Sequence, residues 1–177
     1  MNQILDLLSS FLIGGIVLLA LLGLNMQFTS KNQEIKLAEI TQSSSTSIGR
    51  IIEHDFNKIG YGDPTDSSIV SISNNSITFR ADLNNDGNIE VVNYSLINNA
   101  NGKFVKRIIN SNESKSWLQP IKNFQIFGLN VTSDTTYVSS QVSAVLVNLE
   151  YAKNDYLQDT LSIGVQWRRK FFPKNLD

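Results

Sequence analysis

The sequence predicts an α+β protein in which a long N-terminal helix packs on an antiparallel β-sheet. Two observations support this. The N-terminal third contains an uncharged apolar run, followed by apolar side chains at three- and four-residue steps, which is the helical period. From residue 68 onward the period changes to two, and turn residues separate the runs, which is typical of antiparallel strands. We expect a transmembrane helix over residues 1–30, its amphipathic continuation over 31–62 and a β-sheet head over 63–177.

The apolar run from Leu7 to Leu24 contains no charged side chain. Its eighteen residues, if helical, rise about 27 Å, close to the roughly 30 Å hydrocarbon core of a bilayer. The alternative is a cleaved secretory signal, which needs a basic segment before the apolar run and a small-residue cleavage site after it. Residues 1–6 contain no Lys or Arg, and GLNMQF at residues 23–28 is a poor cleavage site. We therefore expect a retained, single-pass membrane helix.

The residues after the apolar run keep the helical period but have only one apolar face, which needs a sheet to cover it. Gly60, Gly62 and Pro64 predict the end of the helix, because glycine caps helix C-termini and proline cannot continue a helix. Residues 41–47 are rich in hydroxyl side chains that compete for backbone hydrogen bonds, so we expect a kink or loosened turn there. The apolar face consists of Ile35, Leu37, Ile40, Ile48, Ile51, Ile52, Phe56 and Ile59.

Seven runs with a period of two follow the helix and predict strands. The short connections between them favour antiparallel hairpins. One face of such a sheet can remain polar while the other needs cover, and the amphipathic part of the helix is the candidate to supply it. The runs are residues 68–73, 76–81, 88–97, 103–110, 121–130, 142–153 and 161–172.

Composition argues against several classes of function. The net charge is −1, with 15 Lys and Arg against 16 Asp and Glu, whereas nucleic-acid binders usually show a basic excess, so we expect no nucleic-acid partner. The absence of Cys excludes disulfides, thiolate zinc sites and cysteine nucleophiles. The sequence has no phosphate-binding loop, dinucleotide fingerprint or zinc-protease motif, and its one histidine, His54, lies on the helix. We expect no enzyme activity and no small-molecule substrate.

Residues 82–90, DLNNDGNIE, combine a turn signal with the ligand spacing of a calcium loop. Oxygen ligands at alternate positions around a central glycine are typical of the EF-hand, but Asn93 stands where its bidentate glutamate belongs. Asp-Gly is also a strong hairpin signal. Both interpretations stay open, and no other cofactor is expected. If calcium binds, its candidate ligands are Asp82, Asn84, Asp86, Asn88 and Glu90.

Three stretches resemble type IV pilins and the pseudopilins of type II secretion, most closely the larger minor members of that family. IIEHDFNKIGYGD at 51–63 is similar to the end of the family's long helix. ITFRADLNNDGNIEVVNYSL at 77–96 resembles a hairpin of its head, and VLVNLEYAKND at 145–155 with LSIGVQWRRKFFPKNL at 161–176 resembles its closing strand pair. The resemblance implies a structural subunit of a bacterial filament or secretion apparatus, with other pilin-like subunits as partners.

The resemblance also implies roles for the N-terminus. In the family, a carboxylate near the N-terminus pairs with the N-terminal amine of a neighbouring subunit during assembly. Here Leu5 stands at the family's glutamate position and the carboxylate follows at Asp6, so Asp6 and Met1 are the candidate assembly residues, with Met1 as a processed N-terminus.

The resemblance further implies an inner-membrane protein with a periplasmic head, which becomes extracellular once the filament is assembled. Lys31 and Lys36 weakly favour the opposite orientation, because positive charges near a span tend to remain in the cytoplasm. The alternative function is a membrane-tethered β-domain, which calcium could stabilise, that binds a ligand or a surface with no polymer involved.

Overall fold

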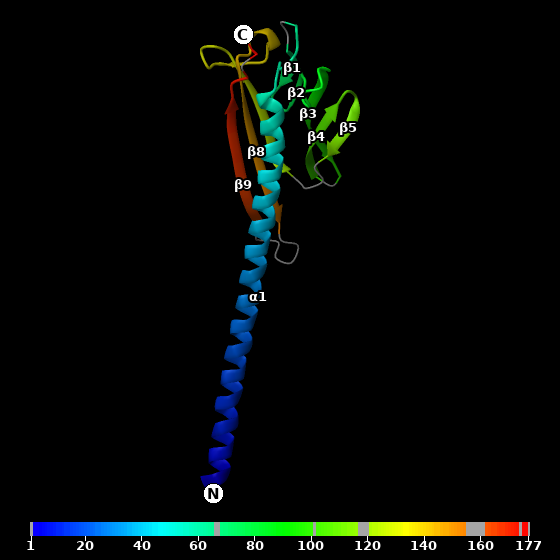
Figure 1. The fold of residues 1–177 in the computed structure, drawn as a ribbon. Coiled ribbons are helices and arrows are strands. Elements are labelled where there is room, and N and C mark those ends of the chain that lie inside the picture. The colour runs from blue at the N-terminus through cyan, green and yellow to red at the C-terminus, as the bar shows by residue number, and fades with distance from the viewer. Residues whose placement is uncertain are drawn as a thin grey trace. The chain divides into compact units, whose positions relative to one another are not determined.

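The computed structural model describes residues 2–65, 68–100, 102–116, 121–154, 162–173 and 175–176. In these residues it shows one long helix, α1 (Asn2–Asn57), followed by strands β1 to β9 in two antiparallel sheets. The predicted class, α+β with a long N-terminal helix followed by antiparallel β-structure, is confirmed. The chain divides into two compact units, Met1–Ile40 and Thr41–Asp177, and α1 begins in the first and ends in the second (Figure 1).

The first unit consists of the N-terminal part of α1. From Leu7 to Leu24 its large apolar side chains are exposed on every side of the helix, from 50% for Leu24 to 84% for Phe11. By length and composition this helix could cross a membrane, and none of its apolar run is buried within the protein. The exposed side chains include Ile4, Leu7, Leu8, Leu12, Ile13, Ile16, Val17, Leu18, Leu19, Leu21, Leu22, Met26 and Phe28.

In the second unit the last turns of α1 pack on the sheets, and Figure 1 shows them alongside β8 and β9. Ile48, Ile52 and Phe56 are at most 3% exposed, and their four-residue spacing puts them on one face of the helix. Thr41 and Ser45 extend this buried stripe toward the N-terminus. The predicted apolar face is therefore correct for this unit.

Two expectations about the middle of α1 are wrong. The helix runs without a break through residues 41–47, where a kink was expected. The hydroxyl of Thr46 donates a hydrogen bond to the Gln42 carbonyl across 2.9 Å, so the competing group is satisfied inside the helix. Ile35 and Ile40, expected on the covered face, are 55% and 47% exposed.

The helix ends where its glycines predict. Gly60 and Gly62 adopt the left-handed conformation, with φ of 75° and 73°, which turns the chain away from the helix axis. The Gly60 N–H donates to the Arg80 carbonyl across 2.9 Å, and the Asp82 N–H donates to the Tyr61 carbonyl across 2.8 Å. These bonds tie the turn after α1 to the end of β2.

The first sheet is a five-stranded meander, and sequence periodicity missed its last strand. The strands are β1 (Ile69–Ser73), β2 (Ser76–Ala81), β3 (Glu90–Asn99), β4 (Gly102–Ile109) and β5 (Asn112–Ser116), paired in that order. The residues of β5 read NESKS and contain no apolar side chain, so they carry no alternation. Pairing with β4 makes them a strand.

The second sheet corrects the expectation of a single sheet. It contains β6 (Ile121–Leu129), β7 (Thr135–Thr136), β8 (Ala144–Asn154) and β9 (Ser162–Phe171), in the order β7-β6-β8-β9. A 3₁₀ turn, η1 (Ser139–Gln141), precedes β8. The backbone of β6 also contacts the turn between β1 and β2, where the Ile126 N–H donates to the Asn74 carbonyl across 2.8 Å.

One aromatic cluster joins α1 to both sheets. The ring of Phe56 on α1 lies 5.6 Å from Phe79 and 5.4 Å from Tyr94 in the first sheet, and 5.3 Å from Phe171 in the second. All four side chains are at most 2% exposed. Aromatic pairs at such tilted geometries stabilise a core beyond the area that they bury. The described sheets and the end of α1 thus share one core.

Candidate functional site

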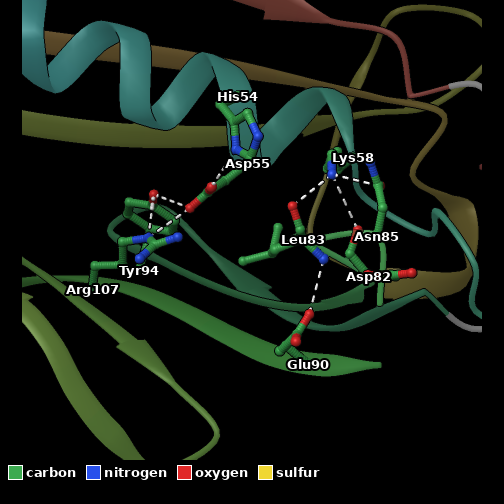
Figure 2. Close-up of polar contacts among 9 residues, drawn as sticks. All are labelled: His54, Asp55, Lys58, Asp82, Leu83, Asn85, Glu90, Tyr94 and Arg107. Atoms are coloured by element: carbon green, nitrogen blue, oxygen red, sulfur yellow. Dashed lines mark hydrogen bonds and ion pairs between the residues drawn. The ribbon is translucent and has the colours of Figure 1, made fainter. Parts of the chain in front are cut away.

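A buried polar cluster joins the last turn of α1 to the first sheet (Figure 2). The carboxylate of Asp55, which is 1% exposed, accepts hydrogen bonds from the Tyr94 hydroxyl at 2.5 Å and from Arg107 Nε at 2.6 Å. Arg107 Nε also donates to the Tyr94 hydroxyl across 3.1 Å. On the solvent side, His54 Nδ1 lies 3.1 Å from the other Asp55 oxygen. We call Asp55, Tyr94 and Arg107 the helix anchor.

The charges of the helix anchor explain why it needs all three groups. Asp55 lies in the last turn of α1, where the helix dipole disfavours an anion, and its burial adds a desolvation cost. Arg107, 13% exposed, supplies the compensating cation. Burial, followed by the charge of Asp55, raises the pKa of Tyr94 well above its ordinary value. Burial alone would lower the pKa of Arg107, but the hydrogen bonds and charges of Asp55 and Tyr94 together outweigh it and raise that pKa.

Sequence patterns do not identify the partners of Asp55 on the sheet. One signal could have found the need for a partner. Asp55 stands within the buried stripe, between Ile52 and Phe56, and at the helix end that disfavours negative charge. A buried carboxylate in that position requires a cation from the sheet, although the sequence does not show which one.

A second contact holds the loop between β2 and β3 against the end of α1 (Figure 2). The ammonium of Lys58 donates to the Leu83 carbonyl at 2.5 Å and to Asn85 Oδ1 at 2.9 Å, and more distantly to the Asp82 carbonyl at 3.4 Å. The same ammonium lies 5.5 Å from the centre of the Tyr61 ring. Lys58 therefore provides the loop with a positive charge that binds its carbonyl oxygens.

The candidate calcium ligands lie close together in and beside that loop. Backbone N–H groups donate hydrogen bonds to the carboxylates of Asp82 and Glu90. The Asp82 carboxylate accepts hydrogen bonds from the Asp86 N–H at 3.2 Å and the Gly87 N–H at 3.0 Å. Glu90 accepts one from the Leu83 N–H at 2.8 Å. Gly87 has a φ of 84°, the left-handed conformation expected of a hairpin glycine.

Asp86 is held by its two amide neighbours. Its carboxylate accepts hydrogen bonds from the Asn88 N–H and from Asn84 Nδ2, both across 2.8 Å. The hydrogen bond from the Asn88 backbone, followed by that from the Asn84 side chain, lowers the pKa of Asp86. Across the described residues, no three His, Cys, Asp or Glu side chains are placed to hold a metal ion together. Each of the loop's three carboxylates thus accepts hydrogen bonds from amide groups of the loop.

The candidate assembly residues belong to the first unit. Asp6 is exposed, and its backbone carbonyl accepts a hydrogen bond from the Ser10 hydroxyl across 2.9 Å. Met1 lies outside the described residues. The structure therefore leaves the carboxylate of Asp6 at the helix surface, next to the apolar run, where a second chain can reach it.

The basic run at residues 168–170 lies within the edge strand β9. Arg169 Nη1 donates to Glu53 Oε2 on α1 across 2.6 Å, while Lys170 lies 4.7 Å from the ring centre of Phe172. Charged side chains on an edge strand discourage pairing with other chains.

Comparison with family models, curated proteins and solved structures finds no match for this chain.

Proposed function

We propose that the chain is a structural subunit of a bacterial filament of the type IV pilin or pseudopilin kind, similar to the larger minor members. The observation that carries this proposal is the exposed apolar surface all round the helix from Leu7 to Leu24. A helix that is apolar on every side needs lipid or other helices around it. The proposed sequence of states is an inner-membrane subunit with a periplasmic head, followed by a filament whose core consists of these helices.

The anchoring of α1 in the second unit supports this role. A subunit held in a filament by its helix must transmit force from that helix to its head. The helix anchor and Lys58 provide charged and hydrogen-bonded contacts at the end of α1, and Phe56 locks the same turn into the core. Such an attachment is directional, because it fixes the rotation of the helix as well as its position.

Asp6 is the proposed specificity residue of assembly. An unpaired carboxylate among apolar helices is costly, whereas one paired with a neighbour's N-terminal amine is favoured by a low-dielectric surrounding. Asp6 would therefore select the axial register between subunits, with no bond-making chemistry involved.

Cross-linking from α1 tests the proposal against a membrane-tethered binding domain. A photoreactive amino acid replaces Phe11, which is 84% exposed, in the full-length chain inside the cell that makes it. The filament proposal predicts adducts with other pilin-like subunits, and the same group at the exposed Lys103 on β4 reports contacts of the head. Adducts of Phe11 with lipid alone would contradict the proposal.

A further inference from the structure

The second sheet has one face that α1 does not cover. On β9, Trp167 and Phe171 point toward the helix: a Cβ added to Gly49 would lie 2.9 Å from Trp167 Nε1, and Phe171 packs on Phe56. Neighbouring side chains of a strand point to opposite faces. The outer face consists of Gln125, Phe127, Leu146, Asn148, Glu150, Gln166, Arg168 and Lys170.

Burial confirms this division along β8. Val145, Val147 and Leu149 are fully buried, while Leu146 and Asn148 between them are half-buried. A sheet face covered by another layer of protein would bury both sets. The outer face is therefore open over the described part of the chain.

A row of three amide side chains crosses the outer face. Asn148 Nδ2 donates to Gln125 Oε1 across 3.3 Å, and Gln166 Nε2 donates to Asn148 Oδ1 across 3.0 Å. Each carboxamide has two N–H donors and an oxygen that accepts two hydrogen bonds. The bonds within the row use only part of that capacity, so the row offers both donors and acceptors to another molecule.

The outer face also has an excess of positive charge, although the whole chain has a net charge of −1. Arg168 is exposed, lies opposite Asn148 and has no ion pair among the described residues. Lys170 donates to Ser133 Oγ across 3.3 Å, a neutral partner. The carboxylate of Glu150, opposite Gln166, is paired with Lys122 at 2.6 Å and does not neutralise Arg168.

We propose that the outer face binds an acidic polysaccharide, a chain of sugars that bear carboxylates. Sugar hydroxyls donate and accept hydrogen bonds, as the amide row does, and an extended polymer can follow a row that crosses three strands. A sugar carboxylate fits the planar guanidinium of Arg168, which can donate two parallel hydrogen bonds. Phe127 and Leu146, which lie opposite each other, offer an apolar surface to the C–H groups of a sugar ring.

Two other classes of macromolecule fit this face less well. A protein partner usually brings an apolar, desolvated centre to the interface, whereas the centre of the outer face is the amide row. Nucleic acids bind through many phosphate contacts, and Arg168 and Lys170 provide few. An acidic polysaccharide needs less charge per residue and more hydrogen bonds to neutral groups.

The proposal is tested by binding of the full-length chain, in detergent micelles, to immobilised polygalacturonate. Dextran serves as the neutral polymer, and polyglutamate and duplex DNA as acidic polymers of other classes. We expect saturable binding to polygalacturonate alone, about tenfold weaker for Arg168→Gln because a charged hydrogen-bonding pair is lost. Asn148→Ala should also weaken binding, since it removes the middle of the amide row.

The matched control is Arg50→Gln. Arg50 is exposed on α1, which packs on the opposite face of the sheet, so this variant removes the same charge from elsewhere. Unchanged affinity of Arg50→Gln, with Arg168→Gln weakened and both folded by circular dichroism, supports the proposal. Equal losses for the two variants, equal binding to dextran, or tighter binding to polyglutamate or DNA would overturn it. These outcomes are independent of whether the chain forms a filament.

Discussion

Arg107 on β4 donates a hydrogen bond to the buried carboxylate of Asp55 on α1 across 2.6 Å. The two residues are 52 positions apart in the chain, and their contact joins the end of the long helix to the sheet that follows. Because Asp55 faces the negative end of the helix dipole, Arg107 is its necessary counter-charge.

Removal of the cation is expected to destabilise the second unit strongly. Arg107→Leu leaves Asp55 buried without its cation, which costs about 3–5 kcal/mol in comparable pairs. Thermal or chemical unfolding of the full-length chain in detergent micelles measures the loss. The control is Arg169→Leu, which breaks the ion pair with Glu53, where the side chains are 48% and 33% exposed. That pair should contribute roughly 0–1 kcal/mol. Similar losses for the two variants would show that Asp55 does not depend on Arg107.

Alkaline pH should weaken the same cluster through Tyr94. The pKa of Tyr94 is raised above its ordinary value of 10.0 in the folded protein, so the folded state holds the proton more tightly than the unfolded state. The associated stability is fully present below pH 10 and is lost as the pH rises toward the folded pKa. Tyr94→Phe should flatten the fall in the free energy of unfolding above pH 10. Burial also raises the pKa of Tyr151. Its ionisation therefore lowers the free energy of unfolding at alkaline pH too, and this part of the fall remains in Tyr94→Phe.

Lys58 should hold the loop between β2 and β3 rather than the fold as a whole. Lys58→Met keeps the length of the side chain but removes the donor to the Leu83 carbonyl and Asn85 Oδ1. We expect a loss of about 1–2 kcal/mol and faster hydrogen exchange at the Asp86 and Gly87 amides. Lys103→Met, on an exposed side chain of β4, is the control. Unchanged exchange at the two loop amides would show that Lys58 does not hold the loop.

Calcium addition separates the two interpretations of residues 82–90. The carboxylates of Asp82, Asp86 and Glu90 already accept hydrogen bonds from backbone or side-chain amides, so we expect the loop to be stable as a hairpin connection. The Tm of the full-length chain should then stay the same when calcium is added and when it is chelated. A rise that chelation reverses, and that Asp86→Asn abolishes, would instead show a metal loop, because a ligand that binds the folded state raises its stability.

Local patterns predicted the parts of this fold that depend on local physics. The apolar run, the buried stripe through Ile52 and Phe56, and the glycine turn after α1 all follow from helical period and capping. The kink expected at residues 41–47 did not form, because hydroxyls such as that of Thr46 bond to the preceding turn. Hydroxyl-rich composition alone cannot distinguish these two outcomes.

Long-range partners were not predictable in the same way. A period of two identifies a strand but not its neighbours, so the separation of β6 to β9 into a second sheet was missed. Asp55 and Arg107 are far apart in sequence, and many cations could have faced that carboxylate. The candidate calcium ligands, in contrast, lie within nine residues, and the structure does bring them into one loop.

Asp6 provides the sharpest test of the proposed filament. Asp6→Ala in the full-length chain should reduce incorporation into sheared filaments at least tenfold, because the N-terminal amine of a neighbouring subunit loses its counter-charge in an apolar bundle. The control is Glu39→Gln, which removes an exposed carboxylate from the same helix outside its apolar run. Both variants should insert in the membrane and unfold at the wild-type temperature, since Asp6 belongs to the first unit and the core to the second. Normal incorporation of Asp6→Ala would remove Asp6 from assembly, and equal defects in both variants would assign the effect to overall charge.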